Sequence, residues 1–391
     1  MYVYDLNCDW TNHSFALREF KVTSQEQIDE IIKVGIEELY IDTRKGSDIE
    51  CLDAEETNNF KESAEKEDAL SYKSKPLHEE LSNAVNVRNE MIKVLNSVFD
   101  NITQGKSLPM GDIKSAMNNM VHSFMSSSDA SVGLINIRKV EVYTVEHAVN
   151  VAILMMAFEK NLTYDAERLM QVGLGGLLMD IGKARLPPYI VNKPSMLTEK
   201  EHAIACRHVQ LSLEVLSNIP DVSDVTLQIV AEHHERMDGS GYPAGKKGDD
   251  ISLYGQMAAI ADAYDSLTSA RAYKRGVSPH AALNRIIRNR AHYNNALAQQ
   301  FVNCIGIYPV GSLVALSDGH FAVVVESEGR RLLCPKVRVF YNSLKRKYVD
   351  PNDVDIAAPE NLNKVKIIGA IDPHKWNIKP GDFLDCADCM T

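Results

Sequence analysis

Histidine, aspartate and lysine side chains recur through the middle of the chain in a pattern that suits a metal site. Divalent iron and manganese take imidazole and carboxylate ligands together. A carboxylate on a facing helix can bridge two ions, and ions about 3.5–4 Å apart polarise a phosphodiester and make hydroxide available at neutral pH. These residue types therefore favour metal-assisted hydrolysis of a phosphoester. The residues concerned are His147, Asp180, Lys183, His208, His233, His234, Asp262 and Asp265.

Isolated histidines and acidic residues have a simpler explanation. A buried histidine on an apolar helix is more often a hydrogen-bonded core residue than a ligand. We expect Asp265 to be a helix-surface or capping residue and His202 to be solvated, and we expect His122 and His280 to be structural. An adjacent His-His pair followed by Glu and a Gly-Ser-Gly-Tyr-Pro loop, at 233–243, has no comparable explanation.

The segment HHERMDGSGYP (233–243) resembles the signature of the HD-GYP family almost residue for residue. The resemblance covers roughly residues 130–300 and rests on several separated motifs. The N-terminal MYVYDLNCDW resembles the small domain that precedes many members, and IGIYPVGSLVALSDG resembles a tail that often follows them. The other motifs occur in the family's order: YTVEH (143–147), MDIGK (179–183), RHVQL (207–211) and IADAYDSLTSARAYK (260–274).

This resemblance implies a mainly α fold, an HD-superfamily helical bundle with a small α/β module before it and a short β-hairpin extension after it. It implies a metal-dependent phosphodiesterase that hydrolyses a bacterial cyclic dinucleotide, cyclic di-GMP or 3′,3′-cyclic GMP-AMP, to the linear dinucleotide. Two divalent ions, iron or manganese, would be the cofactors, with no organic cofactor. Carried over position by position, the metal ligands are His147, Asp180, His208, His233, His234 and Asp262, with Asp180 as the bridge.

The same resemblance assigns residues to catalysis and to the substrate. Asp180 and Lys183 would be catalytic, with the Lys183 ammonium stabilising the scissile phosphate or the leaving oxygen through a charge-assisted contact. The glycines of the loop permit backbone geometry that other residues resist, so the loop would form a close-fitting wall beside the nucleotide. The substrate-binding residues implied are Arg236, Gly239, Gly241, Tyr242, Pro243, Arg271 and Lys274.

Two positions depart from the family pattern. Tyr143 stands where members with a third metal carry Glu, so at most two metals are expected. Met179 occupies the place of the family's His, and a soft, neutral thioether is poorly matched to Fe(II) or Mn(II). The ligand group of His147, Asp180 and Asp262 therefore loses one donor. The other group, which consists of Asp180, His208, His233 and His234, stays complete.

Three consequences of Met179 stay open at this point. Water replaces the missing imidazole in a slower enzyme, or one metal is lost and the domain becomes a cyclic-dinucleotide sensor, or the residue is an isolated change in an otherwise normal enzyme. The retained Lys183 and the intact loop at 233–243 favour catalysis. The loop also argues against a different HD-superfamily phosphohydrolase acting on other nucleotides.

The bulk composition limits the remaining functions. A formal charge of −11 argues against broad binding to DNA, RNA or an anionic membrane. An apolar run of about 18 residues and a basic N-terminus followed by an apolar stretch are both missing from the sequence, which predicts a cytoplasmic protein. The seven cysteines do not suggest a disulfide framework, and Cys386 and Cys389 form a lone C-x-x-C pair.

The chain is expected to have four regions: an α/β module at 1–48, a charged linker at 49–82, the helical domain at 83–304 and a β-rich extension and tail at 305–391. The module would regulate access to the site or mediate a homodimer. Its pattern predicts strands at 2–6 and 36–42, and a helix from Thr23 to Gly35.

Periodicity predicts the elements of the other regions. Alternating residues predict a hairpin at 312–327 around Asp318-Gly319 and a further strand at 336–342. The predicted helices are 85–99, 111–126, 142–159, 164–183, 199–217, 223–235, 253–269 and 279–292.

Overall fold

The chain forms two units, which cover residues 1–74 and 75–391. The computed structural model describes three short strands of the first unit and most of the second. The described residues are 2–5, 20–21, 40–41, 77–136, 143–162, 165–217, 219–220, 222–269, 276–327, 333–358, 360–361, 364–371, 373–376 and 378–384.

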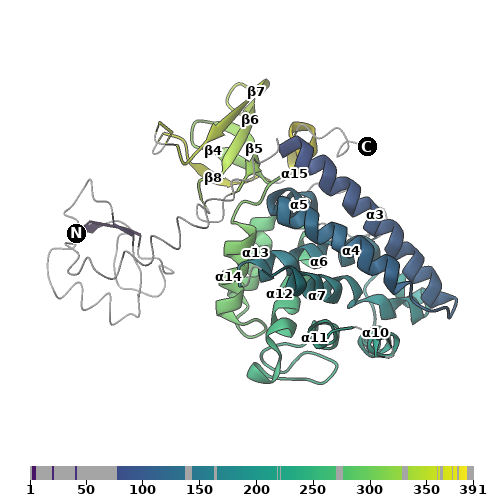
Figure 1. The fold of residues 1–391 in the computed structure, drawn as a ribbon. Helices are drawn as coiled ribbons and strands as arrows, with labels where there is room; N and C mark the ends of the chain where they lie inside the picture. The colour runs from purple at the N-terminus through teal and green to yellow at the C-terminus, as the bar shows by residue number, and fades with distance from the viewer. Residues whose placement is uncertain are drawn as a thin grey trace, which may run out of the picture. The chain divides into compact units, whose positions relative to one another are not determined.

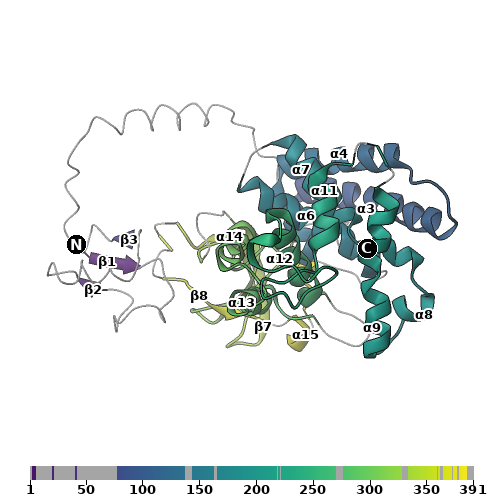
Figure 2. The same cartoon turned by 90° about the horizontal axis from the view of Figure 1, so that it is seen from below.

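The first unit contains a three-stranded antiparallel sheet (Figure 2). Its strands are β1 (Tyr2–Asp5), β2 (Phe20–Lys21) and β3 (Tyr40–Ile41), in the order β2-β1-β3. β1 and β3 fall within the strands predicted at 2–6 and 36–42. The predicted helix from Thr23 to Gly35 lies outside the described residues, as does most of the linker predicted at 49–82.

Helices make up the body of the second unit, as the resemblance implied (Figure 1). None of them, among the residues described above, is long and apolar enough to cross a bilayer. In chain order they are α3 (Leu77–Thr103), α4 (Met110–Ser126), α5 (Ser128–Asn136), α6 (Tyr143–Lys160), α7 (Ala166–Leu178), η2 (Ile181–Arg185), α8 (Pro188–Val191), α9 (Glu199–Cys206), α10 (His208–Leu216), α11 (Asp224–Glu232), η3 (Gly248–Asp250), α12 (Leu253–Thr268), α13 (Pro279–Arg288), α14 (Asn295–Ile305), α15 (Pro373–Trp376) and η4 (Pro380–Phe383).

The centre of the bundle is α6, whose residues from 147 to 159 are all buried. A helix that is apolar around its whole circumference must be surrounded by other elements. It packs on α7, where Gly176 lies so close that an added Cβ would come within 3.0 Å of the Ala152 backbone. It also packs on α12, which places His147 opposite two aspartates of that helix.

Several predicted helix boundaries were wrong. α3 begins at Leu77, so the last six residues of the predicted linker are helical. The helix predicted at 199–217 is interrupted at Arg207, which separates α9 from α10. The helix predicted at 164–183 ends at Leu178, before Asp180. α5 and α14 were missed, although Asn294 caps α14 by accepting from two of its first N–H groups.

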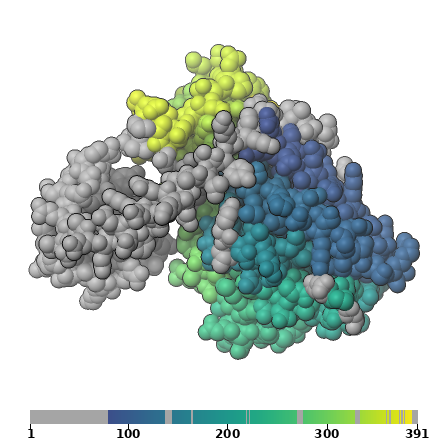
Figure 3. Space-filling model, viewed as in Figure 1, coloured from purple at the N-terminus to yellow at the C-terminus, as the bar shows by residue number. Residues whose placement is uncertain are grey.

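The C-terminal region contains the predicted hairpin within a larger sheet. The strands β4 (Leu313–Leu316), β5 (His320–Glu326), β6 (Lys336–Asn342), β7 (Lys347–Asp355) and β8 (Ile367–Ala370) are antiparallel, in the order β7-β6-β5-β4-β8. The turn between β4 and β5 uses Gly319, whose φ is +83°. Leu81 of α3 and Leu134 of α5 share a buried cluster with Phe321 and Phe340 of the sheet. The sheet therefore packs on the end of the bundle, as the space-filling view shows (Figure 3).

Candidate metal centre

Asp180 lies between the α-helix α7 and the short 3-10 helix η2. Gly182 permits this arrangement, because a Cβ there would lie 2.2 Å from the carbonyl oxygen of His208 on α10. The Ser212 hydroxyl accepts from the Gly182 N–H and donates to the Met179 carbonyl, both at 2.8 Å. Asp180 is thereby held in the interior, with 1% of the residue exposed.

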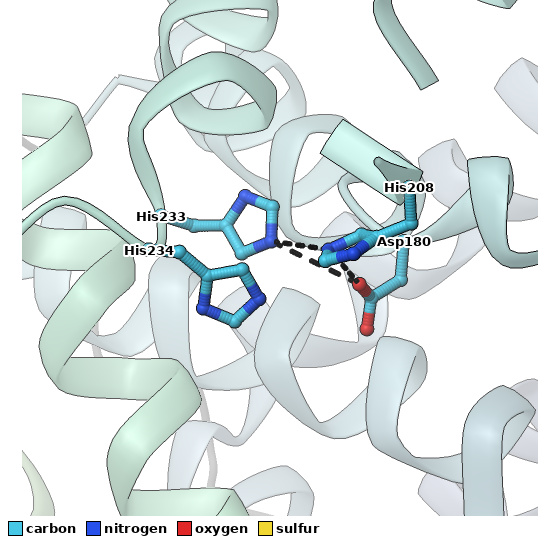
Figure 4. Close-up of side chains that lie close together, drawn as sticks. All are labelled: Asp180, His208, His233 and His234. Carbon is cyan, nitrogen blue, oxygen red and sulfur yellow. Dashed lines mark hydrogen bonds and ion pairs between the residues drawn. The ribbon is translucent and has the colours of Figure 1, made fainter. Parts of the chain in front are cut away.

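Four side chains from three segments converge on one point (Figure 4). His208 is the first residue of α10, and His233 and His234 follow the last residue of α11. His208 Nε2 lies 3.1 Å and His233 Nε2 lies 3.8 Å from Asp180 Oδ1. One ligand atom from each of the four residues lies within 4.8 Å of the others, which is close enough to surround a single ion.

Backbone carbonyls determine which ring nitrogens face this point. His208 Nδ1 lies 2.8 Å from the Ala205 carbonyl and His233 Nδ1 lies 2.9 Å from the Val230 carbonyl. A carbonyl only accepts, so both Nδ1 atoms carry protons, and Nε2 is the nitrogen of each ring that can offer a lone pair to a metal. Burial lowers the pKa of His233 to about 4, which keeps that ring neutral at pH 7.

The same geometry tests whether a divalent cation fits. The Nε2 atoms of His208 and His233 lie 3.3 Å apart, so two lone pairs would face each other without a cation between them. Asp180 Oδ1 is buried beside them and accepts no hydrogen bond of good geometry within the described residues. Imidazole nitrogens and a carboxylate oxygen that lack other partners fit a metal such as Mn(II), Fe(II) or Zn(II).

His147 faces a second group of oxygens. Its Nε2 lies 3.1 Å from Asp262 Oδ1 and 3.6 Å from Asp180 Oδ2, and its Nδ1 lies 2.7 Å from Asp265 Oδ2. Burial alone would lower the pKa of His147, but hydrogen bonds to Asp262 and Asp265 raise it to about 9. The pKa of Asp262 stays below its usual range despite burial, because His147 donates to it.

Asp180 lies between the two groups. Its Oδ1 faces His208 and its Oδ2 faces His147, and Lys183 Nζ donates to Oδ2 at 2.6 Å. Burial would raise the pKa of Asp180, but the charge of Lys183 and the contact with His208 hold it well below its usual range. Met179 is fully buried beside this carboxylate in the chain and adds no charge.

Two buried glutamates fix the loop that follows the paired histidines. Glu235 accepts from the N–H groups of Ala244 and Lys246, at 2.8 and 3.0 Å. Glu232 accepts from the Lys246 ammonium and from the Ser252 N–H, the latter at 2.8 Å, and so joins the end of α11 to the start of α12. These contacts hold the loop against the helices that carry the ligands.

The loop brings its aromatic residue to the metal centre. A Cβ at Gly241 would lie 2.5 Å from the carbonyl oxygen of His234, so this approach requires glycine. Gly239 has a φ of +84°, which also favours glycine. The centroid of the Tyr242 ring lies 4.6 Å from that of His234, and burial raises the pKa of the Tyr242 phenol far above its usual range. Tyr242 therefore remains a neutral hydroxyl beside the ligands.

For the other predicted substrate residues, the described contacts do not include the four clustered side chains. The Arg236 guanidinium lies 5.3 Å from the centroid of the Tyr293 ring, and Pro243 is exposed. Arg271 and Lys274 lie outside the described residues.

One interpretation from the sequence was wrong. Asp265 is not a surface residue, since it is completely buried and contacts His147. Its spacing of three residues from Asp262 on one helix was the available signal. His202 is exposed, as predicted, although its ring lies 6.1 Å from that of Tyr242. Glu235 was not identified as a residue that positions the loop, because its contacts depend on how residues 244–246 fold back.

Comparisons with known proteins identify the family of the chain. A model described as "HD domain" matches residues 132–297, and one described as "Domain of unknown function (DUF3391)" matches residues 1–113. The chain is 31% identical to cyclic di-GMP phosphodiesterase PA4108 of Pseudomonas aeruginosa, over 98% of this chain and 92% of that protein. It is 36% identical to 3′3′-cGAMP-specific phosphodiesterase 1 of Vibrio cholerae, over 41% of this chain and 36% of that protein.

Among solved structures, Bd1817, an HDG"Y"P protein from Bdellovibrio bacteriovorus, aligns with a TM-score of 0.48 at 19% identity, over 73% of this chain and 88% of that chain. The relative from Pseudomonas aeruginosa aligns over nearly its whole length and the HD-domain match includes all six predicted ligands. The chain therefore belongs to the HD-GYP family.

Proposed function

We propose that this chain is a metal-dependent phosphodiesterase that hydrolyses cyclic di-GMP or 3′,3′-cyclic GMP-AMP to the linear dinucleotide. The observation that carries the proposal is the convergence of Asp180 with three imidazoles within 4.8 Å. The names of the relatives support the substrate class, since they are phosphodiesterases of cyclic di-GMP and of 3′3′-cGAMP.

Two sets of residues would hold the metal ions. Asp180, His208, His233 and His234 would hold one ion, and His147, Asp180 and Asp262 would hold the other, with iron or manganese as the expected metals. Bound divalent ions would supply Lewis acidity toward the phosphoryl oxygens and would lower the pKa of water. Asp180 would serve both sets because its two oxygens face opposite groups.

Side chains around the centre would bind and orient the substrate. The Lys183 ammonium is fixed by Asp180 and is 26% exposed, so its remaining protons can contact a phosphate oxygen. The Tyr242 ring offers an aromatic surface and a neutral hydroxyl beside His234. We assign the remaining substrate contacts to Arg236, Gly239, Gly241, Pro243, Arg271 and Lys274.

A second candidate function rests on Met179. This side chain is completely buried and offers only a soft thioether where the family pattern has an imidazole. The His147 set then has one donor fewer than the His208 set. A protein that binds the cyclic dinucleotide without cleaving it would use the same loop and the same Lys183.

One experiment separates the two candidates. The full chain is loaded with Mn²⁺ or Fe²⁺ under reducing conditions and incubated with each cyclic dinucleotide, and products are identified by mass spectrometry. A linear dinucleotide is expected, and the variant D180N serves as the inactive control. Binding of either cyclic dinucleotide without product, at high enzyme concentration and with both metals, would favour the sensor. If the chain neither binds nor cleaves either cyclic dinucleotide, both candidates are overturned.

A further inference from the structure

Asp265 contacts a candidate metal ligand, but the proposed function gives it no role. It lies one turn beyond Asp262 on α12 and has no exposed surface. Its Oδ2 lies 2.7 Å from His147 Nδ1 and accepts from the Ser269 hydroxyl at 3.1 Å. The contact with His147 is on the side of the ring opposite Nε2, the nitrogen that faces Asp180 and Asp262.

We propose that Asp265 is a positioning residue that orients His147 as a metal ligand. An ionised carboxylate only accepts, so its contact places a proton on Nδ1 and leaves the Nε2 lone pair for the metal. A carboxylate partner also increases the basicity of the ligating nitrogen. This inference rests on the metal-binding part of the proposed function and assigns a role to a residue outside the ligand sets.

A comparison within the site supports the assignment. His208 and His233 present Nε2 to their centre because backbone carbonyls three residues earlier accept from Nδ1. His147 instead uses a side chain from another helix for the same purpose. A buried carboxylate is costly unless its charge is used. Asp265 is completely buried, and its shortest described contact is with His147.

The test measures metal binding without any nucleotide. Mn²⁺ is titrated into the metal-free full chain and into D265N, H147Q and the double variant H147Q/D265N, by calorimetry and by electron paramagnetic resonance. D265N keeps the shape of the side chain but removes its charge. We expect D265N to lower the Mn²⁺ affinity of the weaker site, which we assign to His147, by about 10–100-fold, the usual effect of losing an outer-shell partner. Asp129 of α5 accepts from the Ser327 N–H, just after β5, so D129N is a carboxylate control outside the centre and should bind Mn²⁺ as the natural chain does.

The double variant distinguishes positioning from a general structural role. If Asp265 acts through His147, D265N causes no further loss of Mn²⁺ affinity in the H147Q background. An equal loss in both backgrounds, or an unchanged affinity in D265N alone, would overturn the proposal. Because no substrate is present, failure of the natural chain to hydrolyse a cyclic dinucleotide would overturn the phosphodiesterase function and leave this result intact.

Discussion

The two halves of the candidate centre present the same types of side chain but hold them in different ways. In one half, His208 and His233 are oriented by backbone carbonyls of the preceding helical turn. In the other half, His147 is oriented by carboxylates of α12, more than a hundred residues further along the chain. The first half depends on local helix geometry, and the second depends on how two helices pack.

This difference has an electrostatic consequence. Burial lowers the pKa of His233 to about 4, whereas hydrogen bonds to Asp262 and Asp265 overcome burial and raise the pKa of His147 to about 9. Without metal, His233 is a neutral imidazole at pH 7, whereas His147 is an ion-paired imidazolium. A metal ion therefore binds His233 without displacing a proton from Nε2, but it must displace one from His147.

Asp180 is the point where the two halves meet, so D180N should have the largest effect. The substitution removes the charge that faces His208 on one side and His147 on the other. Loss of a mere outer-shell partner costs about 10–100-fold, so loss of the shared ligand should lower kcat/KM by more than about 100-fold. Elemental analysis should find both metals lost.

The variant D262N provides the contrast. Asp262 Oδ1 lies 3.1 Å from His147 Nε2, whereas its Oδ2 lies 3.6 Å from His234 Nδ1. D262N should therefore lose metal mainly from the His147 half and keep more metal in the other half than D180N does. Equal metal content in D180N and D262N would show that the two halves do not bind separately.

Replacing Met179 tests the His147 half by adding a ligand instead of removing one. M179H adds an imidazole next to Asp180 and should raise the affinity of the weaker Mn²⁺ site by at least about tenfold, the lower end of the effect of an outer-shell partner. Calorimetry of Mn²⁺ binding and elemental analysis measure this directly. M179L, which has a similar volume and no ligand atom, is the control and should bind as the natural chain does. A tighter site in M179L would mean that packing, not ligation, limits this half.

Four of the candidate ligands that the resemblance implied do come together, and they lie in short motifs that are visible in the sequence. His233 and His234 are adjacent, and Lys183 is one turn from Asp180. The support for these residues could not be predicted. Asp265 contacts His147 across 118 residues, and the break before His208 interrupts an apolar periodicity that continues through it.

The fold shows the same division. The hairpin β4–β5 was predicted because its residues alternate and Asp318-Gly319 marks the turn. β7 was missed because it contains Pro351 and is mostly exposed on both faces, so no alternation appears in its sequence. The short strand β8 joins the sheet beside β4 through backbone pairing at Val314 and Ala370. Pairing of this kind leaves little signal in side-chain type.

The two halves should also respond oppositely to pH in the metal-free protein. The folded-state pKa of His147 is raised from 6.5 to about 9, so its stabilisation is fully present below pH 6.5 and is lost as the pH rises through 9. The folded-state pKa of His233 is lowered from 6.5 to about 4, so its contribution to stability is present above pH 6.5 and is lost as the pH falls through 4. Each effect is at most about 3 kcal/mol.

Urea unfolding of the chelator-treated protein between pH 4 and pH 10 would measure both effects. H147Q should remove the loss of stability on the alkaline side and leave the loss on the acidic side. If the alkaline loss persists in H147Q, another group causes it and the contrast between the halves fails.

The smallest expected effect concerns the loop that packs on the His234 side. E235Q replaces a buried carboxylate that accepts from the N–H groups of Ala244 and Lys246 with an amide that has one acceptor oxygen. One contact is lost, at a cost of about 1–2 kcal/mol in stability. Because this loop holds Tyr242 against His234, KM for the cyclic dinucleotide should rise, while Mn²⁺ binding by the His147 half should not change. Steady-state kinetics and Mn²⁺ titration of the same sample provide both readouts. The exposed control K247Q should change neither, and a weaker His147 half in E235Q would show that the loop supports both halves of the centre rather than one.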